Sequence, residues 1–271
     1  MTVFREIKIN EHLSAIGEVI GTEVLDVMWL VKGTRRAALI DTGIGAGDLK
    51  GFIATLTDLP VVVLNTHADP DHVGGNAPFG TGYLNRRDAY LVPAAMDAPK
   101  RMFLVEGILK GNTAGLAEVK KQMTTGGTFV RREVEGGDVI ELGGIALEAF
   151  SAPGHTPGSM LYWNRDDREL FAGDSLLETV WLFLDRCASV EAYAQALGRM
   201  RHTFPGDTAI YCGHSMQALP YTVIADLEAC AEAIMAGVPS VERDFGYWGK
   251  CRECRNGGVG ILFQNENVFM G

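Results

Sequence analysis

The feature that most constrains this chain is a dense group of metal-binding residue types between Asn65 and Gly75. The segment reads Asn-Thr-His-Ala-Asp-Pro-Asp-His-Val-Gly-Gly and follows the apolar run 61–64. Four potential ligands fall within six residues: His67, Asp69, Asp71 and His72. The apolar run is short, β-branched and preceded by Pro60, which predicts a buried strand. The ligands would then lie on the loop at its carboxyl end, where open α/β sheets bind ligands. A solvated turn without a metal is the alternative.

Composition narrows the classes of partner. The chain has 271 residues, of which 47% are hydrophobic and 21% charged, as is typical of a globular protein with a substantial core. Its formal net charge of −10 argues against nucleic acid or an anionic membrane surface as the main partner. We therefore expect a small-molecule substrate, and a homodimer is compatible with the sequence.

The sequence favours a cytoplasmic location. Its first residues show no basic region followed by an apolar core, and no apolar segment approaches the length of a membrane span. Five cysteines are an odd number and are thinly spread, which fits a reducing compartment better than a disulfide framework.

Hydrophobic patterning predicts one α/β domain over residues 1–271, with no linker or internal repeat. Strands are expected at 3–9, 13–19, 24–31, 36–40, 61–64, 82–85, 129–133, 138–142, 145–151, 160–163, 169–172, 208–211 and 258–263. Helices are expected at 48–56, 189–202 and 221–236. This order predicts helices that cover sheets in layers.

Two further segments stand apart from this pattern. Residues 94–123 read as a helical insertion of uneven quality, either a lid over a pocket or ordinary core. Residues 237–271 read as a C-terminal tail that ends in the strand 258–263. Four apolar side chains from the insertion and from a later loop could line the pocket or pack in the core: Met102, Phe103, Trp181 and Phe183.

Three more candidate ligands each follow a predicted strand. His155 lies in a loop stiffened by proline and glycine, Asp174 follows the strand 169–172, and His214 follows the strand 208–211. Each residue by itself is weak evidence for a metal site, because a single His or Asp after a strand is usually a turn residue. Together, these loops and the first cluster hold four of the six histidines. The other two, His12 and His202, are expected at the surface.

The complete set resembles the metallo-β-lactamase superfamily. The resemblance is carried by His67-x-Asp69-x-Asp71-His72, Pro153-Gly154-His155-Thr156-Pro157-Gly158-Ser159, Gly173-Asp174, Gly213-His214, and Asp41 in Ile40-Asp41-Thr42-Gly43. It covers nearly the whole chain and implies a single-domain, four-layered αββα sandwich with two divalent metal ions at one edge of the sheets. It says little about the substrate, because one fold hosts many reactions.

The resemblance also implies a role for each residue. His67, Asp69 and His155 would hold the first ion, while Asp71, His72 and His214 would hold the second. Asp174 would bridge the two ions, and Asp71 and Asp174 are the carboxylates assigned to catalysis. Asp41 would steady a ligand from behind by hydrogen bonding.

Asp69 departs from the family pattern, in which most members carry a histidine at that position. A third carboxylate lowers the positive charge of the centre and makes the ions weaker Lewis acids. It also shifts the preference from zinc towards harder ions. Zinc is our first expectation, with iron or manganese as the alternatives.

The sequence leaves three functions open. The first is a hydrolase in which two metal ions activate water against an ester, thioester or lactone-like molecule. Glutathione esters are less favoured, because glyoxalase II-type members add a C-terminal helical region. The second is a non-haem di-iron redox enzyme, similar to flavodiiron proteins, that acts on oxygen, nitric oxide or a persulfide with a separate electron donor. The third is a non-catalytic metal-binding protein, although no ligand position has been lost.

A Cys-x-x-Cys motif lies in the tail at Cys251 and Cys254. It could be half of a structural zinc site or a redox pair. No second pair accompanies it, so two thiols in a glycine-rich turn are the expectation that we favour.

Overall fold

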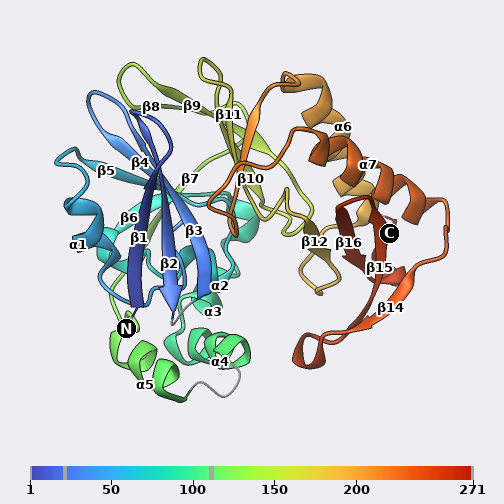
Figure 1. Ribbon diagram of the computed structural model, residues 1–271, viewed down its shortest axis with the longest axis horizontal. Coiled ribbons are helices and arrows are strands. Elements are labelled where there is room, and N and C mark those ends of the chain that lie inside the picture. Colours follow the sequence, from blue (N-terminus) through green and yellow to red (C-terminus); the bar gives the residue numbers. More distant parts are fainter. Residues whose placement is uncertain (1, 21–22, 110–112, 270–271) are drawn as a thin grey trace.

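A computed structural model describes residues 2–20, 23–109 and 113–269 (Figure 1). Its largest sheet has seven strands in sequential order: β1 (Thr2–Lys8), β2 (Leu13–Ile20), β3 (Glu23–Lys32), β4 (Ala37–Ile40), β5 (Val61–Leu64), β6 (Thr81–Leu84) and β7 (Val130–Glu133). Strands β1 to β4 are antiparallel, and β4 to β7 are parallel. Strands β4 and β5 therefore end at the same edge of the sheet, as their parallel pairing requires.

The second sheet has five strands in the order β13-β11-β10-β9-β8. Their bounds are β8 (Val139–Glu141), β9 (Ala146–Ser151), β10 (Met160–Asn164), β11 (Glu169–Gly173) and β13 (Ala209–Cys212). Strands β11 and β13 are parallel, and β9 runs in the same direction because β10 is antiparallel to both β9 and β11. The loops that follow β9, β11 and β13 consequently leave the sheet at one end.

The two sheets pack face to face over a buried apolar core. The first sheet contributes side chains such as Trp29 and Leu64, and the second contributes Tyr162 and Phe171. The Trp29 indole also donates a hydrogen bond to the Cys212 carbonyl oxygen, at 2.9 Å. This packing brings the carboxyl end of β13 against the first sheet, and so places candidate ligands from both sheets close together.

Helices cover the outer faces of both sheets (Figure 1). Helix α1 (Leu49–Ala54) packs on the first sheet, and α6 (Val190–Thr203) and α7 (Thr222–Met235) pack on the second. Polar side chains cap the N-termini of α1 and α6, since Asp48 accepts a hydrogen bond from the Gly51 N–H and Ser189 accepts one from the Ala192 N–H. The result is the expected αββα arrangement. No helix in the described ranges is long and apolar enough to cross a membrane.

The helical insertion comprises α3 (Val92–Ala95), α4 (Ala98–Leu109) and α5 (Thr113–Gln122). Helices α4 and α5 pack in a separate apolar cluster with Ile44 and Ala46, which lie in the loop after β4. Arg101 of α4 is buried and donates hydrogen bonds to the Ile44 and Gly74 carbonyl oxygens. Within the described residues, the insertion is therefore attached to the loops around the metal-ligand cluster.

A third sheet, which the sequence did not predict, joins the tail to an earlier segment. Its strand order is β12 (Thr179–Leu182), β16 (Val259–Phe263), β15 (Lys250–Asn256) and β14 (Val241–Asp244). The prediction found only the strand that corresponds to β16, because β14 and β15 are polar and β12 is short. Residues of β15 and β16 share one core with α7, so the tail is part of the domain.

The location expected for the Cys-x-x-Cys motif is wrong. Cys251 and Cys254 lie on strand β15 rather than in a turn, and both are buried. Residues three apart on a strand face opposite sides of the sheet. Accordingly, Cys251 packs with Phe183 and Leu262, whereas Cys254 joins the core under α7. The two thiols therefore do not form a ligand pair or a redox pair.

Four short 3₁₀-helices and α2 (Pro70–Val73) complete the described elements. The 3₁₀-helices span Ala77–Phe79, Arg86–Asp88, Gly246–Trp248 and Asn265–Asn267. Helix α2 begins with a proline, which suits the first position of a helix. It carries Asp71 and His72 on one short turn directly after Asp69.

Candidate metal centre

All seven predicted ligands lie at the edge where the two sheets meet, five of them in loops and two on a short helix. His67 and Asp69 follow β5, and Asp71 and His72 lie on α2. His155 follows β9, Asp174 follows β11 and His214 follows β13. The structure thus brings together side chains that the chain separates by up to about 150 residues.

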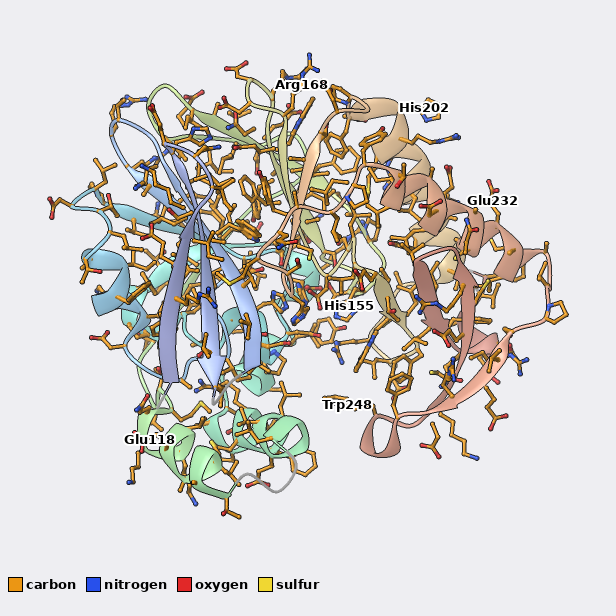
Figure 2. All side chains as sticks on the ribbon, viewed as in Figure 1. Glu118, His155, Arg168, His202, Glu232 and Trp248 are labelled. Atoms are coloured by element: carbon orange, nitrogen blue, oxygen red, sulfur yellow. The ribbon has the colours of Figure 1, made fainter. Side chains whose placement is uncertain are left out.

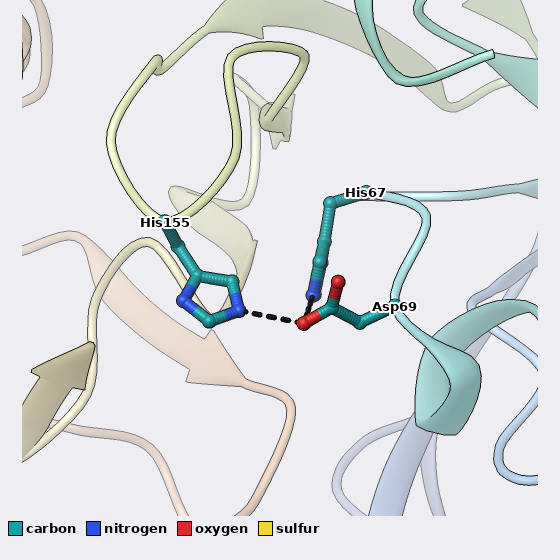
Figure 3. Close-up of side chains that lie close together, drawn as sticks. All are labelled: His67, Asp69 and His155. Atoms are coloured by element: carbon teal, nitrogen blue, oxygen red, sulfur yellow. Dashed lines mark hydrogen bonds and ion pairs between the residues drawn. The ribbon is translucent and has the colours of Figure 1, made fainter. Parts of the chain in front are cut away.

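The first predicted group comprises His67, Asp69 and His155 (Figure 3). Asp69 Oδ2 lies 3.0 Å from His155 Nε2 and 3.8 Å from His67 Nε2. All three side chains are buried. Their ligand atoms are close enough to surround a single ion.

The second predicted group comprises Asp71, His72 and His214. His214 Nε2 lies 3.9 Å from Asp71 Oδ2, and the side chains of Asp71 and His214 are 22% and 34% exposed. This side of the centre is therefore open to solvent, whereas the first group is closed.

Asp174 lies between the two groups. Its Oδ1 is 3.3 Å from His72 Nε2, and its Oδ2 is 3.2 Å from His214 Nε2 and 4.0 Å from His155 Nε2. It also forms a third ligand cluster with His67 and His72. A carboxylate that faces histidines of both groups is in the position that a bridging ligand requires.

Hydrogen bonds orient all four histidines in the same way. His155 Nδ1 lies 2.9 Å from the Trp181 carbonyl oxygen, and His214 Nδ1 lies 3.0 Å from that of Leu25. A carbonyl can only accept, so each Nδ1 carries the proton and each Nε2 presents a lone pair. This is the tautomer that a metal ligand needs, and the partner of Nδ1 holds the ring in place.

Asp41 orients the other two rings from behind the centre. It accepts hydrogen bonds from the Thr66 N–H and hydroxyl group, both at 2.7 Å, and lies 2.8 Å from His72 Nδ1. Because the Thr66 hydroxyl donates to Asp41, its oxygen is free to accept from His67 Nδ1, 3.0 Å away. Asp41 itself adopts a positive φ of 61°, a conformation that this network stabilises.

Several buried atoms at the centre have no hydrogen-bond partner among the described residues. They are His67 Nε2, His72 Nε2 and Asp174 Oδ1. Buried polar atoms are almost always paired, so acceptor atoms that converge without donors are suited to bind a cation. The residues present therefore fit a metal centre.

The electrostatics of the protein without metal lead to the same conclusion. Burial lowers the pKa of His214, but Asp174, Asp26 and Asp71 outweigh burial and raise that pKa to about 10. Burial dominates at His67, whose pKa is held well below its usual value. The carboxylates thus attract positive charge, as a site that exchanges protons for metal ions does.

Two residues that the sequence analysis missed support the centre. Asp88 is fully buried and accepts hydrogen bonds from the Thr156 hydroxyl at 2.6 Å and the Gly158 N–H at 2.8 Å. Arg186 donates a hydrogen bond to Asp69. Asp88 follows the predicted strand 82–85, but in the run Arg-Arg-Asp with no histidine beside it, and Arg186 is a cation, so neither residue matched a metal-ligand pattern.

The four apolar candidates pack mainly against other apolar side chains or lie at the surface. Phe183 is core, Phe103 is 47% exposed, and Met102 packs in the insertion. Trp181 is half-buried within an aromatic group that includes Phe245 and Trp248. Its backbone, however, contacts His155.

The two remaining histidines lie outside the centre. His202 is at the outer surface, as predicted, whereas His155 points into the middle of the molecule (Figure 2). His12 is half-buried rather than fully exposed, because its Nε2 lies 2.9 Å from Glu169.

Comparison with known proteins agrees with this geometry. The family model described as Metallo-beta-lactamase superfamily matches residues 22–252. A hydroxyacylglutathione hydrolase from Rhodopseudomonas palustris (strain BisB5) is 29% identical over 186 residues, which cover 67% of this chain and 58% of that protein. An acyl-coenzyme A thioesterase MBLAC2 from Bos taurus is 26% identical over 160 residues, covering 54% of this chain and 57% of the relative. The chain thus spans less than two thirds of the length of these curated relatives.

Solved structures show the same fold. A metallo-beta-lactamase from Pontibacter korlensis superposes with a TM-score of 0.60 at 15% identity, covering 85% of this chain and 99% of that one. The predicted fold class is confirmed, with the third sheet as an addition. By its sequence and its fold, the chain belongs to the metallo-β-lactamase superfamily.

Proposed function

We propose that this chain is a metal-dependent hydrolase that cleaves an ester or thioester of a small molecule at a two-ion centre. The observation that carries this proposal is the convergence of seven ligand-type side chains with orphaned Nε2 and carboxylate atoms among them. If these residues were only structural, the lack of hydrogen-bond partners for their buried atoms would be unexplained.

The ligand assignment follows the three clusters. His67, Asp69 and His155 would hold one ion, Asp71, His72 and His214 would hold the other, and Asp174 would contact both. Two bound divalent ions would activate a water molecule and stabilise negative charge that develops on the substrate oxygen. No Ser or Cys nucleophile is required.

The side chains of this protein supply orientation and proton transfer. Asp71 is the most accessible carboxylate of the centre, so it is placed to accept a proton from the attacking water and return it to the leaving group. Asp174 is almost buried and lies against His72 and His214, which suits it to hold the reacting atoms in position. Substrate would enter from the exposed side, where Asp71 and His214 lie.

A thioester is the substrate bond that we favour. The curated relatives are named as a hydrolase of hydroxyacylglutathione and a thioesterase of acyl-coenzyme A. The aromatic group at Trp181, Phe245 and Trp248 offers an apolar surface beside the His155 loop for an acyl chain.

Non-haem iron redox chemistry is the second candidate. Asp69 favours it, because two histidines and one terminal carboxylate at each ion form the ligand set typical of non-haem iron. Tight stoichiometric iron without any turnover of esters or thioesters would favour this candidate over hydrolysis.

The test combines metal analysis with substrate screening. Protein purified without chelator should contain two divalent ions per chain by mass spectrometry and should release thiol from short acyl thioesters. The Asp71→Asn variant should lose about 10² to 10⁴-fold in kcat and should bind the second ion more weakly, because Asp71 is both the proposed general base and one of the proposed ligands of that ion. His155→Ala should lose metal as well as activity.

The matched control is His202→Ala, which removes an exposed histidine from α6. It should keep both metal content and turnover. If His155→Ala behaved like His202→Ala in both measurements, the proposed function would be wrong.

A further inference from the structure

Arg186 contacts the one ligand that departs from the family pattern. Its Nη2 donates a hydrogen bond to Asp69 Oδ2. That same oxygen faces both histidines of the first group, His155 at 3.0 Å and His67 at 3.8 Å. The Asp69 side chain is 9% exposed and that of Arg186 is 23% exposed, so this is not a solvated surface pair.

The loop that carries Arg186 is itself fixed. Arg186 lies between β12 and α6, and the next residue, Cys187, donates its N–H to the Leu184 carbonyl oxygen at 2.8 Å. The Ala188 N–H then donates to the Gly154 carbonyl oxygen, also at 2.8 Å. Gly154 directly precedes His155, so the Arg186 loop and the His155 loop are tied together.

The charges of this pair explain how an aspartate can replace a histidine here. With Asp69 in place of histidine, a centre of two divalent ions loses one unit of positive charge. The guanidinium of Arg186 adds that unit back at hydrogen-bond distance, and arginine keeps its charge at every physiological pH. Asp69 and Arg186 together therefore carry the same net charge as one neutral histidine.

We propose that Asp69 and Arg186 act as a single unit, in which Arg186 is a positioning residue that orients Asp69 and offsets its charge at the first ion. This inference rests on the proposed two-ion centre. Carboxylates that bind metals commonly accept a hydrogen bond from an outer partner, which holds the oxygen in place. Burial raises the pKa of Asp69, but Arg186 and His155 outweigh burial and hold that pKa well below its usual value.

The proposal predicts that the effects of the two positions on metal binding are not additive. In the Asp69→His variant, Arg186 would face a neutral ring and repel the ion. The first ion should then bind at least about tenfold more weakly, since contacting residues commonly couple by this amount. Adding Arg186→Met should restore the affinity to within about threefold of the unmodified protein. Competition with a chromophoric chelator measures both values.

Thermal unfolding of the metal-free protein gives a second measurement, independent of activity. Arg186→Met alone leaves a buried carboxylate without its partner, and should lower Tm by about 5 °C or more. In the Asp69→His background there is no carboxylate to leave unpaired, so Arg186→Met should leave Tm unchanged or raise it. Arg165→Met is the matched control, because the surface pair of Arg165 with Glu148 should show no such reversal.

Two results would overturn the proposal. If the double variant bound metal no better than Asp69→His alone, Arg186 would act independently of Asp69, for example on a substrate anion. If the unmodified protein held one ion and Arg186→Met held two, the guanidinium would be taking the place of the first ion. The first result would leave the proposed function intact, whereas the second would also contradict its two-ion centre. The proposed hydrolysis itself fails if the unmodified protein binds no metal, turns over no ester or thioester, or is unaffected by His155→Ala.

Discussion

Asp88 shows how one buried carboxylate can position two loops that are distant in sequence. It accepts hydrogen bonds from the Ala68 N–H, in the loop of His67, and from Thr156 and Gly158, in the loop of His155. A Cβ atom at Gly158 would lie 2.5 Å from Asp88 Oδ1, so the close approach requires glycine. At the scale of single residues, the centre depends on partners behind the ligands as much as on the ligands.

Replacing Asp88 tests this dependence. Asp88→Ala would leave the buried Ala68 and Gly158 N–H groups unpaired, and we expect a loss of about 3 kcal/mol in the free energy of unfolding together with weaker metal binding. Urea unfolding and metal analysis would measure the two effects. Asp207→Ala, at an exposed carboxylate, should change neither. Unchanged metal affinity in Asp88→Ala would contradict the positioning role.

Glu18 makes stability depend on pH. Its side chain is fully buried and accepts hydrogen bonds from the Ile44 and Ala46 N–H groups, at 2.7 and 2.9 Å. Burial outweighs these bonds and raises its pKa from 4.5 to about 7. Between pH 4.5 and about pH 7, the folded protein therefore keeps a proton on Glu18 that the unfolded chain has lost.

Because the folded-state pKa is raised, the stabilisation is complete below pH 4.5 and is lost as the pH rises through about 7. In metal-free protein, this group should lower the free energy of unfolding by on the order of 3 kcal/mol across that range. Urea unfolding at pH 5 and pH 8 would show it as a difference between the unmodified protein and Glu18→Gln. An identical pH slope in both proteins would rule this role out.

At the scale of elements, the helical insertion is anchored rather than free. Arg101 of α4 donates hydrogen bonds to the Ile44, Gly74 and Met96 carbonyl oxygens, at 2.7, 3.1 and 3.2 Å. Two of these acceptors belong to the loops beside the ligand cluster. The sequence left a lid and ordinary core open for residues 94–123, and from this packing we propose that they serve as core.

Arg101→Met tests the anchor. It would leave several buried carbonyl oxygens unpaired and should cost about 3 to 5 kcal/mol in the free energy of unfolding. Hydrogen exchange should accelerate more in α4 and α5 than in β10 and β11, because the insertion loses its attachment. Lys100→Met, at the exposed neighbouring position, is the control. Equal exchange in α4 for both variants would contradict the anchor.

At the scale of the whole molecule, the centre joins the two halves of the sandwich. Four of the proposed ligands follow strands of the first sheet and three follow strands of the second, so bound ions would connect the sheets at their edge. Ions that bind only the folded state stabilise it by mass action.

Metal removal should therefore lower the stability of the entire fold. Chelator-treated protein should unfold about 5 to 10 °C below protein that is saturated with zinc at about 100 times the dissociation constant. Calorimetry would measure the difference. The same comparison with Asp174→Ala should show a much smaller shift, and a full shift in that variant would place the stabilising ions elsewhere.

What the sequence determined by itself was local. Potential ligands follow apolar strands at His67, His155, Asp174 and His214. The end of a strand can be predicted from the sequence because the hydrophobic pattern stops where the strand stops. Most strands and helices were predicted within one or two residues for the same reason. The motif spacing then indicated the superfamily and its layered fold.

Only the tertiary structure decided the partners of those ligands. Arg186 and Asp69 are 117 residues apart, and no periodicity connects them. Strands β14 and β15 are polar and give no strand pattern, yet β15 pairs with β16 and joins the core under α7, and β14 pairs with β15. Contacts of this kind depend on how distant segments pack in three dimensions, and local sequence patterns do not predict that packing.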